Sequence, residues 1–179
     1  MPEISKEYTL LKQNIDIRFL EKILFEFESK NKDLYIEIHH QISEEIINDY
    51  IKFCIEAENN TLGLLRLGEV SKISVENIRQ QYNLRTEDKF YFDVLIFNED
   101  RKIIGKLNSW GYKKGGPYHI FHMYVKETHR GRGLGKLLLF KTIKIALDNI
   151  PELSKFDLQT HESNVPAQKT ICQIGFVLK

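Results

Sequence analysis

The groups with the clearest chemical use lie in a glycine-rich turn between an aromatic, β-branched segment and a strongly apolar helical segment. The turn consists of Arg130, Gly131, Arg132, Gly133, Leu134, Gly135 and Lys136. Alternate glycines remove side chains, so successive backbone N–H groups converge at the positive end of the helix dipole. This geometry binds phosphate, and the three basic side chains add charge that suits a diphosphate. The alternative is an ordinary glycine-rich turn with solvated basic residues.

The spacing of the glycines argues against two familiar phosphate-binding loops. A nucleotide-hydrolase loop has Ser or Thr after its Gly-Lys pair, whereas Leu137 follows Lys136 here and cannot supply a hydroxyl for magnesium. A dinucleotide-binding turn that began at Gly131 would need its third glycine at position 136, where this chain has the lysine. Both alternatives are therefore weakened.

At these residues the chain resembles the GNAT superfamily of acyl-CoA-dependent N-acetyltransferases. The family signature [QR]-x-x-G-x-[GA] matches Arg130–Gly135 without a gap. A second similarity lies downstream, where Asn164-Val165-Pro166-Ala167 is followed by Gly175-Phe176. The hairpin that contains Lys102–Gly105 also looks like the family's second and third strands.

The resemblance implies a fold and a co-substrate. The fold is a mixed α/β (α+β) domain whose mostly antiparallel sheet splays open between its fourth and fifth strands, with helices on its faces. The co-substrate is acetyl-CoA (CoA), whose pantetheine arm would contact backbone groups of Met123 and Val125 and the side chain of Asn164. The glycine turn would hold the pyrophosphate. The implied reaction is acetyl transfer to a primary amine, an acyltransferase reaction of the EC 2.3.1 class.

At the position that supplies the proton for the departing thiolate, this chain differs from the family. Many relatives place a tyrosine seven residues after the asparagine, and this position is Ile171, which cannot donate a proton. Cys172 is adjacent, but successive residues of a helix point about 100° apart. Two hypotheses stay open. The favoured one is an N-acetyltransferase that uses a direct ternary complex, and the other is a non-catalytic acyl-CoA-binding sensor or scaffold.

A general base must take the proton of the acceptor amine. The candidates are Glu37, His119, His122, His161 and Glu162. Strict alternation along the strand puts His119 on the same face as Met123, and turns His122 to the opposite face. Relatives that act on arylalkylamines carry a histidine at the position of His119, so we take His119 as the candidate base and Glu162 as the alternative. The two strand histidines lack further ligands nearby, so no metal is expected.

Periodicity predicts the elements that position these residues. Apolar residues at helical spacing predict helices at 14–29, after Ser43, after Ser74, after Gly135 and from Ala167 to Ile174. Alternating or β-branched residues predict strands at 8–12, 34–39, 90–97, 102–112, 118–125 and 156–160. Turn residues join three of these strands as consecutive antiparallel neighbours.

We expect one GNAT-like domain over residues 34–179, preceded by an N-terminal appendage over residues 1–33. Relatives continue after the Gly-Phe pair through a hairpin, but only Val177–Lys179 remain here, so this hairpin is short or missing. The C-terminal edge of the sheet then needs cover. We expect the appendage to pack there or to mediate a homodimer, with the homodimer slightly favoured.

Composition narrows the classes of function. The 179 residues include 26 Lys plus Arg, 25 Asp plus Glu and 42% hydrophobic residues, which fits one domain with a substantial core. A net charge of +1 makes nucleic acid a poor partner. The sequence shows neither a signal peptide nor an apolar run near the roughly 20 residues of a membrane span, so we expect a cytoplasmic protein with no membrane partner. Two distant cysteines give no disulfide framework.

The acceptor amine stays open at this stage. A small amine, an aminoglycoside-like compound, a polyamine, an amino acid and a protein N-terminus or lysine all fit. Trp110, Tyr112 and Tyr118 are candidates to line its pocket, although aromatic strand residues more often serve ordinary packing.

Overall fold

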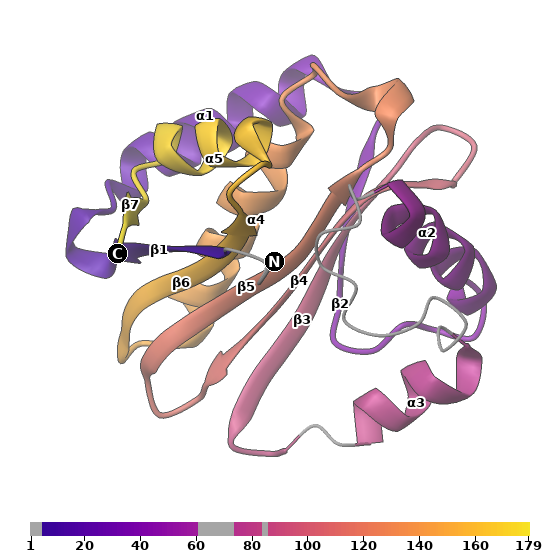
Figure 1. Cartoon of the computed structure of the whole chain (residues 1–179), viewed down its shortest axis with the longest axis horizontal. Coiled ribbons are helices and arrows are strands. Elements are labelled where there is room, and N and C mark those ends of the chain that lie inside the picture. Colours follow the sequence, from indigo (N-terminus) through magenta and orange to yellow (C-terminus); the bar gives the residue numbers. More distant parts are fainter. Residues whose placement is uncertain (1–4, 61–73, 84–85) are drawn as a thin grey trace.

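The fold is a seven-stranded sheet with helices on both faces (Figure 1). The computed structural model describes residues 5–60, 74–83 and 86–179. The strands are β1 (Ser5–Leu11), β2 (Tyr35–His39), β3 (Lys89–Phe97), β4 (Ile103–Tyr112), β5 (Gly116–Val125), β6 (Leu153–His161) and β7 (Val177–Leu178). The helices are α1 (Ile17–Lys30), α2 (Ile47–Asn60), α3 (Val75–Asn83), α4 (Leu134–Asn149) and α5 (Val165–Gln173), with 3-10 turns η1 (Lys12–Asn14) and η3 (Glu127–His129). Every predicted strand and helix has a counterpart among these elements.

The strands are ordered β2-β3-β4-β5-β6-β1-β7. Only β5 and β6 are parallel, and the other neighbours are antiparallel. Asn98 closes the first predicted hairpin, because its Oδ1 accepts a hydrogen bond from the N–H of Lys102 at 2.9 Å. The predicted mixed, mostly antiparallel sheet is confirmed.

Side-chain capping sets most of the helix starts. Asp16 accepts a hydrogen bond from the N–H of Phe19 at 3.1 Å and caps α1, and Ser74 accepts from the N–H of Asn77 at 3.2 Å and caps α3. The helix predicted after Ser43 begins later, at Ile47, because a turn intervenes. Among the described residues no helix has both the length and the apolar character that crossing a bilayer requires.

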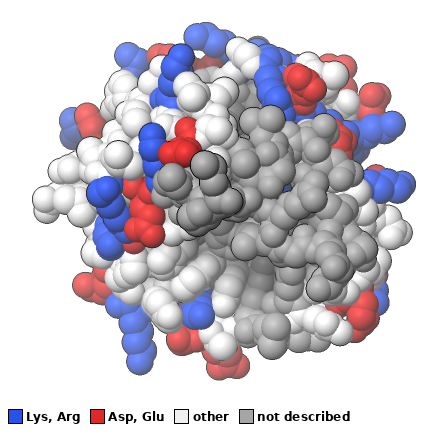
Figure 2. Space-filling model, viewed as in Figure 1, with Lys and Arg blue, Asp and Glu red and all other residues white. Residues whose placement is uncertain are grey.

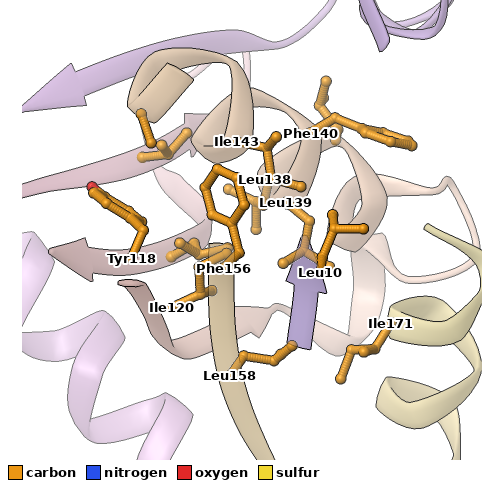
Figure 3. Packing of buried hydrophobic residues seen from close by; sticks show 14 of the residues in the cluster. Leu10, Tyr118, Ile120, Leu138, Leu139, Phe140, Ile143, Phe156, Leu158 and Ile171 are labelled. Atoms are coloured by element: carbon orange, nitrogen blue, oxygen red, sulfur yellow. The ribbon is translucent and has the colours of Figure 1, made fainter. Parts of the chain in front are cut away.

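Two hydrophobic clusters fill the space between the sheet and its helices. Helices α1, α4 and α5 cover one face, and α2 and α3 cover the other (Figure 1). Figure 3 shows part of the first cluster, where Tyr118 and Ile120 of β5 and Phe156 of β6 meet Leu138 and neighbouring residues of α4. Helix α4 is apolar on most sides because it lies between the sheet and α1.

The N-terminal segment is part of this sheet. Strand β1 pairs with β6 along its whole length, from Ser5↔His161 to Leu11↔Lys155, and carries the short β7 on its other edge. Tyr8 and Leu10 point into the first cluster. The segment therefore covers the edge of β6 within the same chain, whereas the homodimer remains a prediction.

The sheet opens between β5 and β6. Their parallel pairing runs from Gly116↔Leu153 to Ile120↔Leu158 and stops there, although β5 continues to Val125 and β6 to His161. Counted from β2, these are the fourth and fifth strands, so the opening lies where it was expected. Basic and acidic side chains are interspersed on the coloured part of the face in Figure 2, in keeping with the balanced charge of the chain.

Candidate active site

The glycine turn forms the N-terminus of α4. Gly131 and Gly133 have φ angles of 79° and 78°, in the left-handed region that other residues rarely adopt. Gly133 is the N-cap residue of α4, and no side chain caps the helix there. The first N–H groups of α4 are thus directed away from the helix, as in protein sites that bind anions.

Helix α1 and the residues that follow it contact the glycine turn. A Cβ atom on Gly133 would lie 2.4 Å from Cε1 of Phe27, so only glycine allows α1 to pack so closely. Nη2 of Arg132 donates to both carboxylate oxygens of Asp33 at 2.9 and 2.8 Å and to Oδ1 of Asn31 at 3.0 Å. These hydrogen bonds lower the pKa of Asp33. The guanidinium of Arg132 is therefore held by the residues that follow α1, and its role as a phosphate ligand remains a prediction.

The other predicted phosphate ligands have surroundings that differ from those of Arg132. Nε of Arg130 donates to the carbonyl of Val125 at 3.1 Å, and its guanidinium carbon lies 5.6 Å from the ring centre of Tyr124. Leu134 is buried in the first cluster, and Lys136 is half-buried. The guanidinium groups of Arg130 and Arg132 thus both have partners within the chain, whereas no partner of Lys136 is seen among the described residues.

A cleft of about 100 Å³ lies where β5 and β6 separate. Leu139, Leu158 and Ile171 of the first cluster line it, and so do Cys54 and Tyr124 of the second. Because the two clusters lie on opposite faces, the cleft connects the two sides of the sheet.

A β-bulge in β5 lies at this cleft. Between positions 106 and 108 of β4, one residue lies opposite two residues of β5. His122 in the bulge has a φ angle of 49°, a strained conformation of the kind that clusters at functional sites. Ile120 and Met123 both pack in the first cluster, so His119 points to the opposite face. The strict alternation that grouped His119 with Met123 is therefore wrong, because the bulge shifts the register by one residue.

The two strand histidines have different surroundings. His122 lines the cleft, and desolvation by its walls together with the nearby Lys106 ammonium lowers its pKa to about 4. The ring remains accessible to solvent and is neutral near pH 7. His119 lies outside the cleft lining and stacks on Trp110 with ring centres 4.5 Å apart. Burial is the main cause that lowers the pKa of His119, and Asp157 opposes it.

A comparison with protein family models shows which family the chain belongs to. Residues 26–176 match the model of the acetyltransferase (GNAT) family. The chain belongs to this family. The predicted recognition is thereby confirmed. Members of the GNAT family typically use an acyl-CoA donor.

Solved structures show the same GNAT fold. A tandem GNAT protein from the clavulanic acid biosynthesis pathway aligns with a TM-score of 0.71 at 14% identity, over 98% of this chain and 50% of that one. A conserved protein of unknown function from Staphylococcus epidermidis gives 0.62 at 17% identity, over 98% and 57%. An aminoglycoside acetyltransferase from an uncultured soil sample gives 0.60 at 16% identity, over 81% and 89%. The chain thus spans about half the length of the first two, and curated proteins gave no match.

Two positions of the GNAT pattern meet at the cleft on α5. Asn164 caps α5 by accepting a hydrogen bond from the N–H of Ala167 at 3.3 Å, and it lines the cleft together with Met123. Ile171 is 1% exposed and also lines the cleft, so the position where many relatives have a tyrosine does face it. Cys172 is exposed, as the helical rotation predicted.

The remaining base candidates lie outside the cleft lining. The side chain of Glu162 is exposed in the turn after β6, and its carbonyl accepts a hydrogen bond from Gln168. Glu37 pairs with Arg101 on the edge strand β2, and Nδ1 of His161 lies 3.0 Å from the hydroxyl of Ser163. No group of three potential metal ligands occurs in the described parts of the chain.

Sequence reasoning missed five polar residues of the cleft. They are Cys54 of α2, Lys106 of β4, Tyr124 of β5, and Gln159 and Thr160 of β6. The position of Lys106 in the middle of the otherwise uncharged strand Ile103–Tyr112 was a signal that could have found it. Cys54 and Tyr124 have the pattern of ordinary core residues, and only the opening of the sheet brings them to the cleft.

Proposed function

We propose that the protein transfers an acetyl group from acetyl-CoA to a primary amine in a direct ternary complex. The observation that carries this proposal is the cleft between β5 and β6, whose lining includes Leu139 of α4 and Met123, and a Cβ atom on Gly135 of the glycine turn would lie 3.9 Å from Cε of Met123. The glycine turn would hold the pyrophosphate, and the unpaired edge of β5 with Met123 and Val125 would face the pantetheine arm. Asn164 would contact the same arm. The donor supplies the activated acyl group, and the cleft positions it for the amine on the side of α2.

Acyl transfer forms a bond between the amine nitrogen and the carbonyl carbon and breaks the carbon–sulfur bond. The amine must lose a proton, and the thiolate must gain one. The test is a panel of amines with acetyl-CoA, followed by release of free thiol and by mass spectrometry of the product. Thiol release that depends on one class of amine is the expected result. No release with any class would contradict the proposed reaction.

The second candidate is a non-catalytic acyl-CoA-binding protein. The buried, apolar Ile171 at the usual tyrosine position favours it. Binding of CoA measured by calorimetry, combined with no thiol release across the panel, would select this candidate. Loss of both binding and release would contradict both candidates.

His119 is our proposed base, with Glu162 as the alternative. Because burial lowers the pKa of His119, its imidazole is neutral and able to accept a proton at neutral pH. As the pH falls through this lowered pKa, the ring becomes protonated and kcat/KM should fall. In His119→Ala, turnover should drop by about 10²-fold near neutral pH, with less loss at high pH, where the amine deprotonates unaided. A pH profile of kcat/KM measures this, and a uniform loss across pH would indicate packing instead.

A homodimer and a cytoplasmic location complete the proposed function. Solution mass measured by light scattering tests the homodimer, and a monomer at micromolar concentration would contradict it. Fractionation of cells that express the full chain tests the location.

A further inference from the structure

A buried ammonium group faces the cleft. Lys106 is 7% exposed and lines the cleft from the centre of β4. Its Nζ lies 3.1 Å from Sγ of Cys54 and 5.0 Å from the ring centre of Tyr50. Neither partner is a carboxylate, and no carboxylate of the described residues lies within 4.0 Å of Nζ. Buried ammonium groups are normally paired with an anion because desolvation is costly, so this one has a place for an anionic partner.

A second polar group without a partner lies beside it. Tyr124 stands directly opposite Lys106 in the ladder between β4 and β5 and is 7% exposed. Its hydroxyl is buried and has no hydrogen-bond partner among the residues that the structure describes. Both residues line the cleft. An ammonium and a hydroxyl from facing strands form a pair of donors that suits the two oxygens of a carboxylate.

The acidic and histidine side chains described near the cleft do not pair with Lys106 or Tyr124. Within the described chain, Asp93 is the one buried acidic residue, and it accepts a hydrogen bond from Asn108 at 2.6 Å outside the cleft lining. His122 is neutral near pH 7. Lys106 is therefore the charged side chain of the described cleft lining at neutral pH.

Basic residues also gather beside His119 on the same face of the sheet. Nζ of Lys89 lies 4.5 Å from the ring centre of Trp110. Lys155 and Lys179 pair with Asp157 at 3.0 and 3.2 Å, and Lys179 also lies 3.6 Å from Glu7. The three lysines all act on His119 electrostatically, against a single aspartate. Asp157 and Glu7 offset two of these three positive charges.

We propose that Lys106 and Tyr124 bind a carboxylate of the acceptor, so the acceptor is an amino acid or another amino-carboxylic acid. This inference rests on the proposed acetyl transfer. The amine nitrogen would meet the thioester in the cleft while the acceptor's carboxylate lies against the ammonium and the hydroxyl. Polyamines and aminoglycoside-like compounds lack such a carboxylate.

The test compares kcat/KM for amino acids with kcat/KM for their carboxamides, in which a neutral amide replaces the carboxylate, and adds spermidine as a polycation. Because the carboxamides also have a less basic amine, kcat/KM is expressed per concentration of neutral amine. The wild type should prefer the carboxylate by roughly 10- to 100-fold, as expected for a hydrogen-bonded charge pair. Lys106→Met should bring this ratio close to one, Lys106→Arg should restore part of it, and Tyr124→Phe should lower it. Lys126→Met is the matched control, because Lys126 pairs with Glu56 at 2.9 Å outside the cleft lining and should leave the ratio unchanged.

The outcomes separate recognition from other roles. A wild-type preference for carboxamides or spermidine would overturn the inference. An equal loss of kcat/KM for all acceptors in Lys106→Met would also overturn it, because that result would mean that Lys106 acts in the reaction step and not in recognition of the carboxylate. Tm of Lys106→Met without ligand should match or exceed that of the wild type, since a buried charge without an anionic partner is removed.

A binding measurement keeps the inference separate from the proposed reaction. Calorimetry with CoA present compares an N-acetyl amino acid with its carboxamide, and it needs no turnover. Stronger binding of the carboxylate that is lost in Lys106→Met would support the site even if no amine is acetylated. Equal binding of both compounds would overturn it, whatever the result of the amine panel.

Discussion

Gly133→Val should abolish measurable CoA binding. The φ angle of 78° is strained for valine, and its Cβ would overlap the ring of Phe27, which lies 2.4 Å from that position. The turn would therefore move, and the N–H groups at the start of α4 would lose their common direction. Hydrogen bonds to a charged group contribute about 1.5–3 kcal/mol each, so loss of two lowers affinity by at least 10²-fold. Calorimetry with CoA on the folded variant measures this.

Gly135→Ala is the matched control for the same turn. The family signature allows Ala here, and a Cβ on Gly135 would lie 3.9 Å from Cε of Met123, an ordinary contact. CoA affinity should stay within about threefold of the wild-type value, which corresponds to well under 1 kcal/mol. Unchanged CoA binding in Gly133→Val would show that the turn does not hold the pyrophosphate. The contact with Phe27 also means that Gly133→Val should lose about 1–3 kcal/mol of stability.

Removal of residues 1–30 should abolish cooperative folding. The deletion exposes the edge of β6 and removes four buried side chains of the first cluster, namely Tyr8, Leu10, Leu20 and Leu24. Burial of each contributes about 1.5–3 kcal/mol, and the sum is comparable to the whole stability of a typical domain. Thermal unfolding followed by circular dichroism, with light scattering for aggregates, tests this. A cooperative transition near the wild-type Tm would contradict the role of β1 in the sheet.

Two neighbouring leucines provide a graded version of the same experiment. Leu10 is 4% exposed and packs under α4, whereas Leu11 is 39% exposed on the same strand. Leu10→Ala should cost about 2–5 kcal/mol, and Leu11→Ala less than about 1 kcal/mol. Equal effects of the two substitutions would show that β1 does not face the core as described.

Local patterns predicted the elements and the glycine turn well, because these depend on near neighbours. The alternate glycines and the Leu-rich stretch after Gly135 define the start of α4 directly. The segment Phe90–Phe97 and the turn at Asn98 predict their hairpin for the same reason. The opening between β5 and β6 was predicted through the family resemblance, not through any pattern in this chain.

Features that depend on distant residues were not predictable. Nothing local shows that His122 adopts a left-handed conformation, and this one residue decides which side of the sheet His119 faces. The sequence around Arg132 does not indicate that its partner is Asp33, almost a hundred positions earlier in the chain. The side chain of Lys106 reaches the cleft only because the sheet separates at Ile120. The face of a side chain and its distant partners can be assigned only once the pairing of the strands in the folded chain is known.

The place of β1 has a consequence for biosynthesis. Thr9 donates a hydrogen bond to the carbonyl of Phe156, 147 positions later, so β1 is synthesised long before its partner strand β6. Until β6 emerges from the ribosome, Tyr8 and Leu10 have no partner strand and stay available to other chains or to chaperones. Pairing of such distant segments also slows folding because a long loop must close first. A nascent chain stalled before residue 150 should therefore be sensitive to protease within β1.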